Sequence, residues 1–435
     1  MITDETAVAE AGVPVGGGVA PFKRVFDPND VALPPSLKEA LAVFFLKYGR
    51  FLRTFFPVLR VGGLVTVTRF DDVQEVLRRD DVFRMELAEK HKLVTGGFNF
   101  LLGMDEGPEY RRVLTQLMKA FRREDVPAFG RRSAELGQII VDRARGRLDV
   151  VQDLMTLVPR ILCEQYYGVV LDDETRAVFP LWTFALSQYL FIDTKNFKPW
   201  RRAALAAAER VRAVLDTSIA KAKAAARAGT PPDNIILRLL EMQRTDPNGL
   251  SDGEIRASIM GMVQGFIPTN TMAAGHLLEF LMRRDDVKAA AQDAARADDD
   301  ERLFRILIET SRLAGGIGLG RFRRCAQNTA ICVGTQREKR IFKGERVLAG
   351  TLSAMFDGRR VKDPLKFNPD RDPNDYMLFG YGLHICLGVL LAKAQITQTL
   401  KPLLKKENLR AASGEAGRLT RFGAFPQHLI VEFDP

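Results

Sequence analysis

The 435-residue sequence is poor in cysteine and has no long apolar run, and each shortage excludes a class of protein. Its four cysteines show no paired spacing, so a disulfide-stapled secreted fold is not expected. None of them forms a zinc-type pattern with a histidine. No apolar stretch approaches the roughly 18 residues that a membrane-spanning helix needs. We therefore expect a cytoplasmic protein without a transmembrane segment.

A recognition surface for nucleic acid is also missing. The formal net charge is +10, from 64 basic and 54 acidic residues, but the basic residues are scattered and form no recognition helix or RNA-binding signature. A solvated surface or an acidic protein partner explains this charge better. Residues 315–320 are rich in glycine but lack the Lys-Ser/Thr pair of a phosphate loop, so nucleotide binding is not expected.

The chain is longer than one hydrophobic core usually serves, which predicts two domains or one large two-lobed unit. Residues 1–20 carry acidic residues and a run of glycines without a signal-peptide pattern, so we expect a flexible tail before a folded unit at 21–435. Residues 61–77 predict a strand and then a helix, residues 124–227 are almost wholly helical, and 419–433 predict a hairpin.

Two short apolar patches, residues 41–46 and 55–59, lie beside the basic residues Lys47, Arg50 and Arg53. Together they could form a basic amphipathic surface that touches lipid. A partly buried helix is the commoner arrangement for such a pattern, and it is the one that we expect.

Residues 379–388 (FGYGLHICLG) place a cysteine in a glycine-rich turn just before an apolar helix. A thiolate at a helix N-terminus is stabilised by the helix dipole and by unpaired amide N–H groups. Gly380 and Gly382 allow the backbone to turn with positive φ, and Gly388 lets the following helix pack closely. The stretch predicts a metal-ligand loop with Cys386 as the ligand, and the alternative is an inert buried thiol.

This stretch fits the haem-binding signature Phe-x-x-Gly-x-His/Arg-x-Cys-x-Gly at every fixed position, so the chain resembles the cytochrome P450 superfamily, bacterial type. The resemblance implies one two-lobed catalytic domain, mainly α-helical with small β-sheets. It implies that Cys386 is the axial thiolate of haem b (iron protoporphyrin IX). It also implies that His384 contacts a haem propionate and that Phe379 packs beside the sulfur, in a loop shaped by Gly380 and Gly388.

The resemblance implies a reaction as well. Members of the family insert one oxygen atom from O2 into an apolar organic substrate, with electrons from NAD(P)H. The chain carries no flavin or iron–sulfur domain, so a separate ferredoxin and a separate reductase are expected. Basic residues that could dock an acidic ferredoxin are Arg359, Arg360, Lys362 and Lys366.

Residues 252–284 predict a long helix that resembles the family's oxygen-activation helix, where the usual text is Ala/Gly-Gly-x-Asp/Glu-Thr. Thr269 falls at the alcohol and Gly265 near the oxygen groove, but Pro268 stands where the acid should be. Proline inside a helix removes an N–H and predicts a kink. Thr269 and Asn270 could order a water that carries protons.

The missing carboxylate leaves several functions open. One is a monooxygenase whose protons come from water or substrate. Another is an enzyme that consumes a peroxide or a fatty-acid hydroperoxide, as an isomerase, lyase or peroxygenase, and needs no electron donor. A non-catalytic haem sensor is a third, although the retained Thr269 argues against it. A kinked buried helix without chemical meaning is the simplest alternative.

Propionate contacts are less clear in the sequence. Tyr110 and Leu114 stand where many bacterial members have a histidine and an arginine, and Arg111 or Arg112 could substitute. Of the arginines that open the strand after residue 320, Arg321 is preferred, and the alternatives are Arg323 and Arg324.

The pattern Glu309-x-x-Arg312, followed by Arg371, resembles the family's buried charged triad, whose role is to fix the cysteine loop. Pocket candidates are Phe98, Phe100, Phe266 and Gly265. Residues 179–200 are dense in aromatic rings and resemble the lid over the substrate channel, which suggests a bulky apolar substrate. Ordinary core packing is the alternative for each ring.

Overall fold

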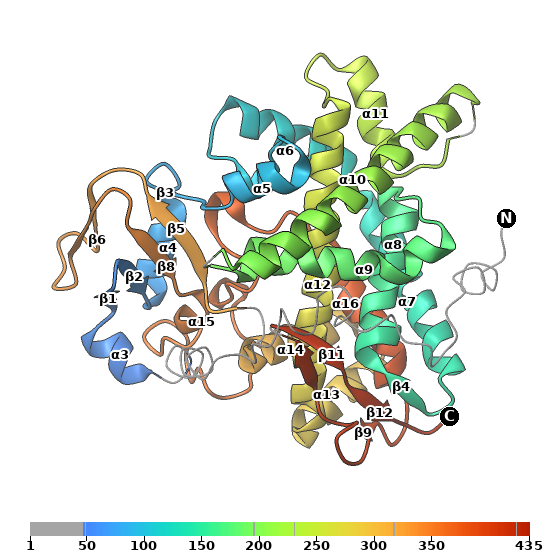
Figure 1. Ribbon diagram of the computed structural model, residues 1–435. Coiled ribbons are helices and arrows are strands. Elements are labelled where there is room, and N and C mark those ends of the chain that lie inside the picture. Colours follow the sequence, from blue (N-terminus) through green and yellow to red (C-terminus); the bar gives the residue numbers. More distant parts are fainter. Residues whose placement is uncertain (1–46, 48, 195, 230, 316–317, 423) are drawn as a thin grey trace.

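The computed structural model describes residues 47, 49–194, 196–229, 231–315, 318–422 and 424–435, so the predicted tail at residues 1–20 lies outside this range. Most of the described chain is helical (Figure 1). The α-helices are α3 (Arg50–Phe55), α4 (Phe70–Arg78), α5 (Ala88–Thr95), α6 (Pro108–Ala120), α7 (Val126–Arg143), α8 (Leu157–Leu162), α9 (Asp173–Ser187), α10 (Lys198–Arg227), α11 (Ile235–Thr245), α12 (Asp252–Met282), α13 (Asp285–Arg296), α14 (Asp300–Ala314), α15 (Thr351–Ala354) and α16 (Val389–Leu404).

The strands are short and form small sheets. They are β1 (Val58–Val61), β2 (Leu64–Val67), β3 (Phe83–Arg84), β4 (Arg147–Asp149), β5 (Arg321–Cys325), β6 (Thr329–Ile331), β7 (Lys339–Ile341), β8 (Arg346–Ala349), β9 (Arg410–Ala411), β10 (Thr420–Phe422), β11 (Phe425–His428) and β12 (Ile430–Glu432). A five-stranded sheet has the order β1-β2-β8-β5-β3, in which only β2 and β8 run parallel. The other sheets are β4-β12-β9, β10-β11 and β6-β7.

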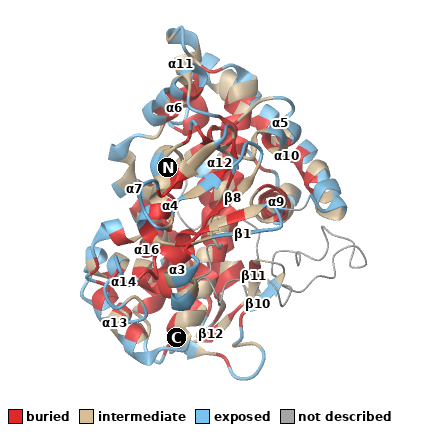
Figure 2. Cartoon of the chain, turned by 90° about the vertical axis from the view of Figure 1, so that its left-hand side faces the viewer, coloured by how far each residue is buried: buried red, intermediate tan, exposed pale blue. Residues whose placement is uncertain are grey.

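Two hydrophobic cores divide the described chain into two lobes. The larger core lies among the helices and includes Leu136, Val211, Ile259 and Leu400. The smaller core joins the five-stranded sheet to α4 and α15. In Figure 2 the buried segments run through the middle of the molecule and the exposed ones lie around them. The expectation of a mainly helical, two-lobed fold with small sheets is confirmed.

The long helix α12 runs through the centre of the molecule (Figure 1). Its first turn is fixed by a capping box in which the Ser251 side chain accepts from the Glu254 N–H and the Glu254 carboxylate accepts from the Ser251 N–H. The helix continues for 31 residues and passes through Pro268 without interruption. The helix therefore does not end at Pro268.

The helix α3 differs from the predicted basic surface. Arg53 is buried and donates to the Ser353 hydroxyl at 3.2 Å, and the half-buried Lys47 donates to the Leu313 carbonyl. Of the three basic residues only Arg50 is exposed. The patch at residues 41–46 lies outside the described residues. In the described part, α3 is partly buried, as expected, and it is Arg53 that faces inward. Within the described residues, no helix is both long and apolar enough to cross a bilayer.

Candidate active site

The cysteine loop lies between a 3₁₀ turn at Gly382–His384 and the start of α16. The Cys386 N–H donates to the Phe379 carbonyl at 2.9 Å, which closes the loop. Gly380 and Gly382 have φ of +84° and +75°, as the sequence predicted. A side chain at Gly382 would collide with the Leu77 carbonyl, so glycine is needed for the loop to rest on α4.

Cys386 is exposed, yet burial raises the pKa of its thiol. The Gly388 N–H and the charge of Arg321 act in the opposite direction on the same pKa. Cys386 is thus accessible although many protein atoms surround it, so its sulfur faces an internal space rather than open solvent. The other described cysteines, Cys163, Cys325 and Cys332, are buried. Cys386 is therefore the thiol that a ligand can reach.

A single stripe of α12 is accessible. Between residues 257 and 278 every position is buried except Met262, Gly265, Thr269, Ala273 and His276. These positions are three or four residues apart, so they lie on one face of the helix. A side chain added at Gly265 would meet nothing within 4 Å. Open space therefore lies along this stripe at the position where the sequence predicted an oxygen groove.

Thr269 lies on the stripe one turn after Gly265, and its hydroxyl donates to the Gly265 carbonyl. Thr271 is fully buried instead, 3.1 Å from both the Thr156 hydroxyl and the Met155 carbonyl. The Asn270 amide donates to the Phe266 carbonyl at 2.7 Å, and its Oδ1 has no partner among the described residues. Thr269 is thus the threonine that faces the open space.

Pro268 is buried within α12, and no Asp or Glu occurs between residues 255 and 278. Proline lacks the N–H that would bond the Gln264 carbonyl one turn earlier. The Gln264 side chain is buried, and both of its polar atoms lack a partner among the described residues. The centre of this helix therefore holds unpaired amides where a carboxylate was expected.

The strand β5 sorts the three candidate arginines by face. Side chains alternate along a strand, so Arg321 and Arg323 share a face and Arg324 points away. Arg324 pairs with Glu86 at 2.7 Å and is half exposed. Arg323 is buried, and its Nε has no partner among the described residues. Arg324 is therefore excluded as the propionate ligand, and Arg321 and Arg323 remain as candidates.

His384 lies beside Arg323 rather than Arg321. Burial, and then the charge of Arg323, lower the pKa of His384 to about 4. The Asp80 carboxylate is 4.0 Å from the His384 Nε2, and it is the charge that raises the pKa of Arg323 against the effect of burial. Arg321 instead donates to the Leu378 carbonyl at 3.3 Å and interacts with the charge of Cys386. The geometry therefore favours Arg323 over the preferred Arg321 as the partner of His384.

Tyr110 contacts the cysteine loop directly. Its hydroxyl donates to the Leu383 carbonyl at 2.9 Å, and its ring lies edge-on to His384 at 5.7 Å. Arg111 pairs with Glu106 on the surface, and Arg112 pairs with Glu254 at the start of α12. Neither arginine takes the place of the missing one at this loop.

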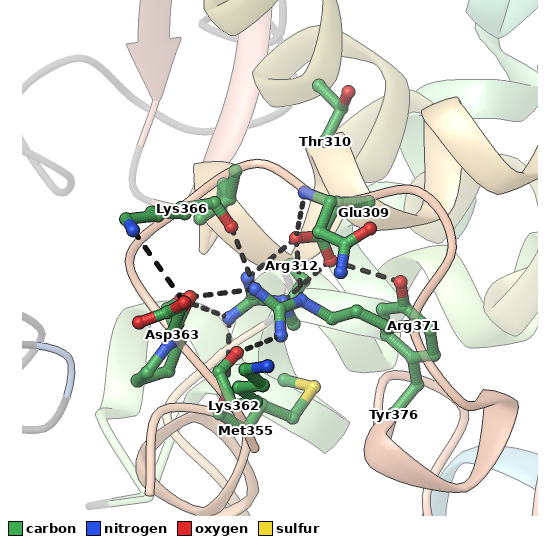
Figure 3. A network of polar contacts seen from close by, with 12 residues as sticks. Glu309, Thr310, Arg312, Met355, Lys362, Asp363, Lys366, Arg371 and Tyr376 are labelled. Atoms are coloured by element: carbon green, nitrogen blue, oxygen red, sulfur yellow. Dashed lines mark hydrogen bonds and ion pairs between the residues drawn. The ribbon is translucent and has the colours of Figure 1, made fainter. Parts of the chain in front are cut away.

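The predicted triad forms a closed network behind the loop (Figure 3). Glu309 accepts from Arg312 Nε and Nη2, both at 2.8 Å, and from Arg371 Nε at 2.9 Å. The Tyr376 hydroxyl and the Asn368 N–H also donate hydrogen bonds to the Glu309 carboxylate. All three charged side chains are buried, and both arginines also donate to backbone carbonyls of residues 355–366. The network ties α14 to the segment that leads to Cys386.

The pocket candidates separate into two groups. The rings of Phe98 and Phe100 lie over α12, because a side chain at Gly253 or Gly261 would collide with them. Phe266 packs edge-on to Tyr167 at 5.6 Å, within an aromatic cluster of the main core. Phe266 is therefore a core residue, and so is Phe100, which is buried in the same core. In the aromatic stretch Phe179, Phe184 and Tyr189 are also buried, and the half-buried rings are Trp182, Phe191 and Trp200.

Sequence reasoning missed two polar residues near the site. Asp80 follows α4 and reaches His384 and Arg323, although nothing in its own sequence neighbourhood signals this. His91 in α5 is fully buried against Phe100 and Phe191, and both of its ring nitrogens lack a partner among the described residues. Its position within an otherwise helical pattern gave no sign of that burial.

Comparison with known proteins settles the family. The family model described as Cytochrome P450 matches residues 33–416. The chain belongs to the cytochrome P450 family. Cytochrome P450 107B1 of Saccharopolyspora erythraea is 26% identical over 395 residues, covering 86% of this chain and 90% of that protein. The mycinamicin IV hydroxylase/epoxidase of Micromonospora griseorubida is 28% identical over 352 residues, covering 78% and 81%.

A solved structure confirms the fold of this P450. The haem domain of the Tepidiphilus thermophilus P450 has a TM-score of 0.74 and 20% sequence identity, and the match covers 93% of this chain and 97% of that one. The family establishes an oxidoreductase of the monooxygenase class with a haem-thiolate cofactor. Cytochromes P450 typically act on small organic substrates and use redox partners.

The residues of this P450 fit a haem. Cys386 offers an accessible sulfur, and a side chain at Gly265 of α12 would meet nothing within 4 Å. Arg323 Nε is a buried donor without a partner among the described residues, which suits a propionate. The neutral His384 ring and the Tyr110 hydroxyl add further polar groups at the same loop.

Proposed function

We propose that this P450 is an O2-dependent monooxygenase for an apolar organic substrate, with haem b held by Cys386. The observation that carries the proposal is the accessible stripe of α12, which presents Thr269 and the open space at Gly265. When bound, the haem supplies O2 activation. The task of the protein is then to position the substrate, exclude water and deliver protons.

Thr269 is the residue that we assign to proton delivery, together with Asn270. The Thr269 hydroxyl can release the Gly265 carbonyl and hydrogen-bond a water in the open space. The Oδ1 of Asn270, buried and without a partner among the described residues, is an acceptor one residue away. Such neutral groups pass protons through an ordered water rather than from a carboxylate, so the delivery is slower than with an acid at residue 268.

The substrate is apolar and bulky in this proposal. Phe98 is half-buried over the start of α12, and the half-buried rings of Trp182, Phe191 and Trp200 supply further apolar surface. A relative is named for the hydroxylation and epoxidation of mycinamicin IV, which supports an organic molecule as substrate. Electrons come from a separate ferredoxin and reductase. Arg359, Arg360, Lys362 and Lys366 are all exposed and could meet an acidic ferredoxin.

An oxygen-source experiment tests the proposal. The holoenzyme is incubated with NADPH, a ferredoxin, its reductase, isotopically labelled O2 and a panel of apolar substrates, and products are identified by mass spectrometry. The proposal predicts a product with one labelled oxygen that depends on the electron donor. Product that forms with peroxide but never from labelled O2 and the electron donor would contradict it, and so would the absence of any product under either supply of oxidant, as expected of a sensor.

Hydroperoxide turnover is a second candidate, favoured by Pro268 in place of the acid. An enzyme that starts from a ready-made O–O bond needs no proton relay of that kind. Mixing the holoenzyme with a polyunsaturated fatty-acid hydroperoxide and no reductant tests this candidate. Rapid conversion by the wild type that is lost in Cys386→Ser would support it. In the monooxygenase proposal, Pro268→Asp instead raises product yield per NADPH by restoring an acid.

A further inference from the structure

Exposed phenylalanines are concentrated at one corner of the sheet lobe. Phe51, Phe55 and Phe56 are 64%, 64% and 50% exposed, and Leu59 and Val61 on β1 follow with 37% and 65%. The Phe51 ring lies 4.7 Å from that of Phe55 and 6.3 Å from that of Phe56. We call these five residues the aromatic corner. Figure 1 shows α3, β1 and β6 along one edge of the molecule.

The helix α3 differs from an ordinary surface helix because one of its arginines is buried and its phenylalanines are exposed. Its arginine Arg53 points inward to Ser353, and its backbone is held by Arg69, which donates to the Arg53 and Thr54 carbonyls. The phenylalanines point outward. Because burial of a phenylalanine ring normally stabilises a fold, an arrangement that fixes the arginine inside and three rings outside indicates a surface that meets another apolar phase.

Basic residues surround the aromatic corner, and acidic residues are absent from its segment. Residues 40–70 contain no Asp or Glu, and of their five basic residues Arg53 is buried and Arg60 is paired with Glu345 at 2.9 Å. Arg50 is exposed at the start of α3. On the neighbouring β7 segment Arg340 and Lys343 are exposed, and Phe342 is 50% exposed with the Arg60 guanidinium 5.3 Å from its ring. The surroundings of the corner therefore favour an anionic partner.

We propose that the aromatic corner binds the surface of an anionic lipid bilayer. Phenylalanine has no polar group to match a specific protein partner, and apolar rings among arginines and lysines are the composition of interfacial membrane segments. Such binding would hold the enzyme at the phase in which an apolar substrate dissolves.

The test uses the full-length holoenzyme in vesicle flotation. Vesicles contain phosphatidylcholine alone or an equal mixture with phosphatidylglycerol. We expect binding to the mixed vesicles, weaker binding at high salt and little binding to phosphatidylcholine alone. The triple variant F51S/F55S/F56S should lose binding, and Arg50→Gln should weaken it about fivefold, the effect of one basic residue at an anionic surface.

Matched controls separate the corner from general surface effects. Leu365→Ser removes another exposed apolar side chain, which is 57% exposed, and should bind like the wild type. Each variant must keep the carbon monoxide spectrum of the wild type, which shows that the haem site is intact. Absence of wild-type binding to mixed vesicles overturns the proposal, as does a triple variant that binds normally. A dimer that the triple variant dissociates, without vesicle binding, would assign the corner to a second copy and also overturn it.

Discussion

Two pairs of residues of the same type differ in their surroundings, although the members of each pair are close in the sequence. Arg323 and Arg324 are adjacent in sequence, but one is buried beside His384 and the other pairs with Glu86 outside. Thr269 and Thr271 are two positions apart, but only Thr269 lies on the accessible stripe of α12. Each pair therefore supplies a functional residue and its own control.

Replacing Arg323 by leucine should loosen the haem. A charge-assisted hydrogen bond contributes about 1.5–3 kcal/mol, so loss of the propionate contact should speed haem transfer to apomyoglobin roughly tenfold or more. Arg324→Leu, on the opposite face of β5, should leave the transfer rate near the wild-type value. Equal rates for the two variants would contradict the assignment of Arg323.

Replacing either threonine by valine should separate function from stability. Thr269→Val should lower product per NADPH at least about tenfold, because proton transfer in catalysis is worth more than that, while the thermal midpoint stays nearly constant. Thr271→Val leaves Met155 and Thr156 without their partner and should cost about 1–2 kcal/mol of unfolding free energy with normal coupling. If Thr271→Val lost coupling and Thr269→Val kept it, the hydroxyl that delivers protons would be that of Thr271.

Among the elements, α14 and the segment before the cysteine loop are joined by a fully paired ionic network. Glu309 satisfies two arginines, a tyrosine hydroxyl and a backbone N–H, all away from water. A charge removed from such a site leaves its partners buried without compensation. The network is therefore a structural support for the haem loop rather than part of the chemistry.

Glu309→Gln should destabilise the protein strongly. Two buried guanidinium groups would lose their counter-charge, which costs about 3–5 kcal/mol of unfolding free energy. Glu301→Gln on the same helix α14 breaks only exposed pairs with Lys393 and Arg305, and should cost less than about 1 kcal/mol. Denaturant titration of both holoproteins measures the difference. A similar small loss in both would argue against a structural triad.

The sequence was most informative where a residue type is required by local geometry. Glycine at positive φ, a cysteine before a helix and the Glu-x-x-Arg spacing all marked elements that the structure contains. It was less informative where the answer depends on packing between distant elements. The partnership of Arg323, Asp80 and His384, for example, joins three separate segments.

At the scale of the whole molecule, two histidines have lowered pKa values in the folded state. Burial lowers the pKa of His91 to about 4, and burial with the nearby Arg421 lowers that of His276 to about 4. The unfolded chain takes up these protons at a pKa near 6.5, so between about pH 6.5 and 4 it binds more protons than the folded chain. Unfolding free energy therefore falls as the pH falls through that window.

His91→Leu should reduce this acid sensitivity. From pH 7 to pH 5 the wild type should lose about 2 kcal/mol more unfolding free energy than the variant, the linkage expected for one such histidine. Chemical denaturation at the two pH values measures it. The two proteins should have parallel pH profiles if His91 is charged in the folded state, and that result would refute the assignment.

The most direct test of the account is the carbon monoxide spectrum of the reduced protein, recorded for the wild type, Cys386→Ser and Cys325→Ser. A thiolate ligand from Cys386 predicts the red-shifted Soret band of a haem-thiolate centre in the wild type and in Cys325→Ser, and its loss in Cys386→Ser. An imidazole-type band in the wild type, or an unchanged band in Cys386→Ser, would contradict the assignment of Cys386 on which the proposed function depends.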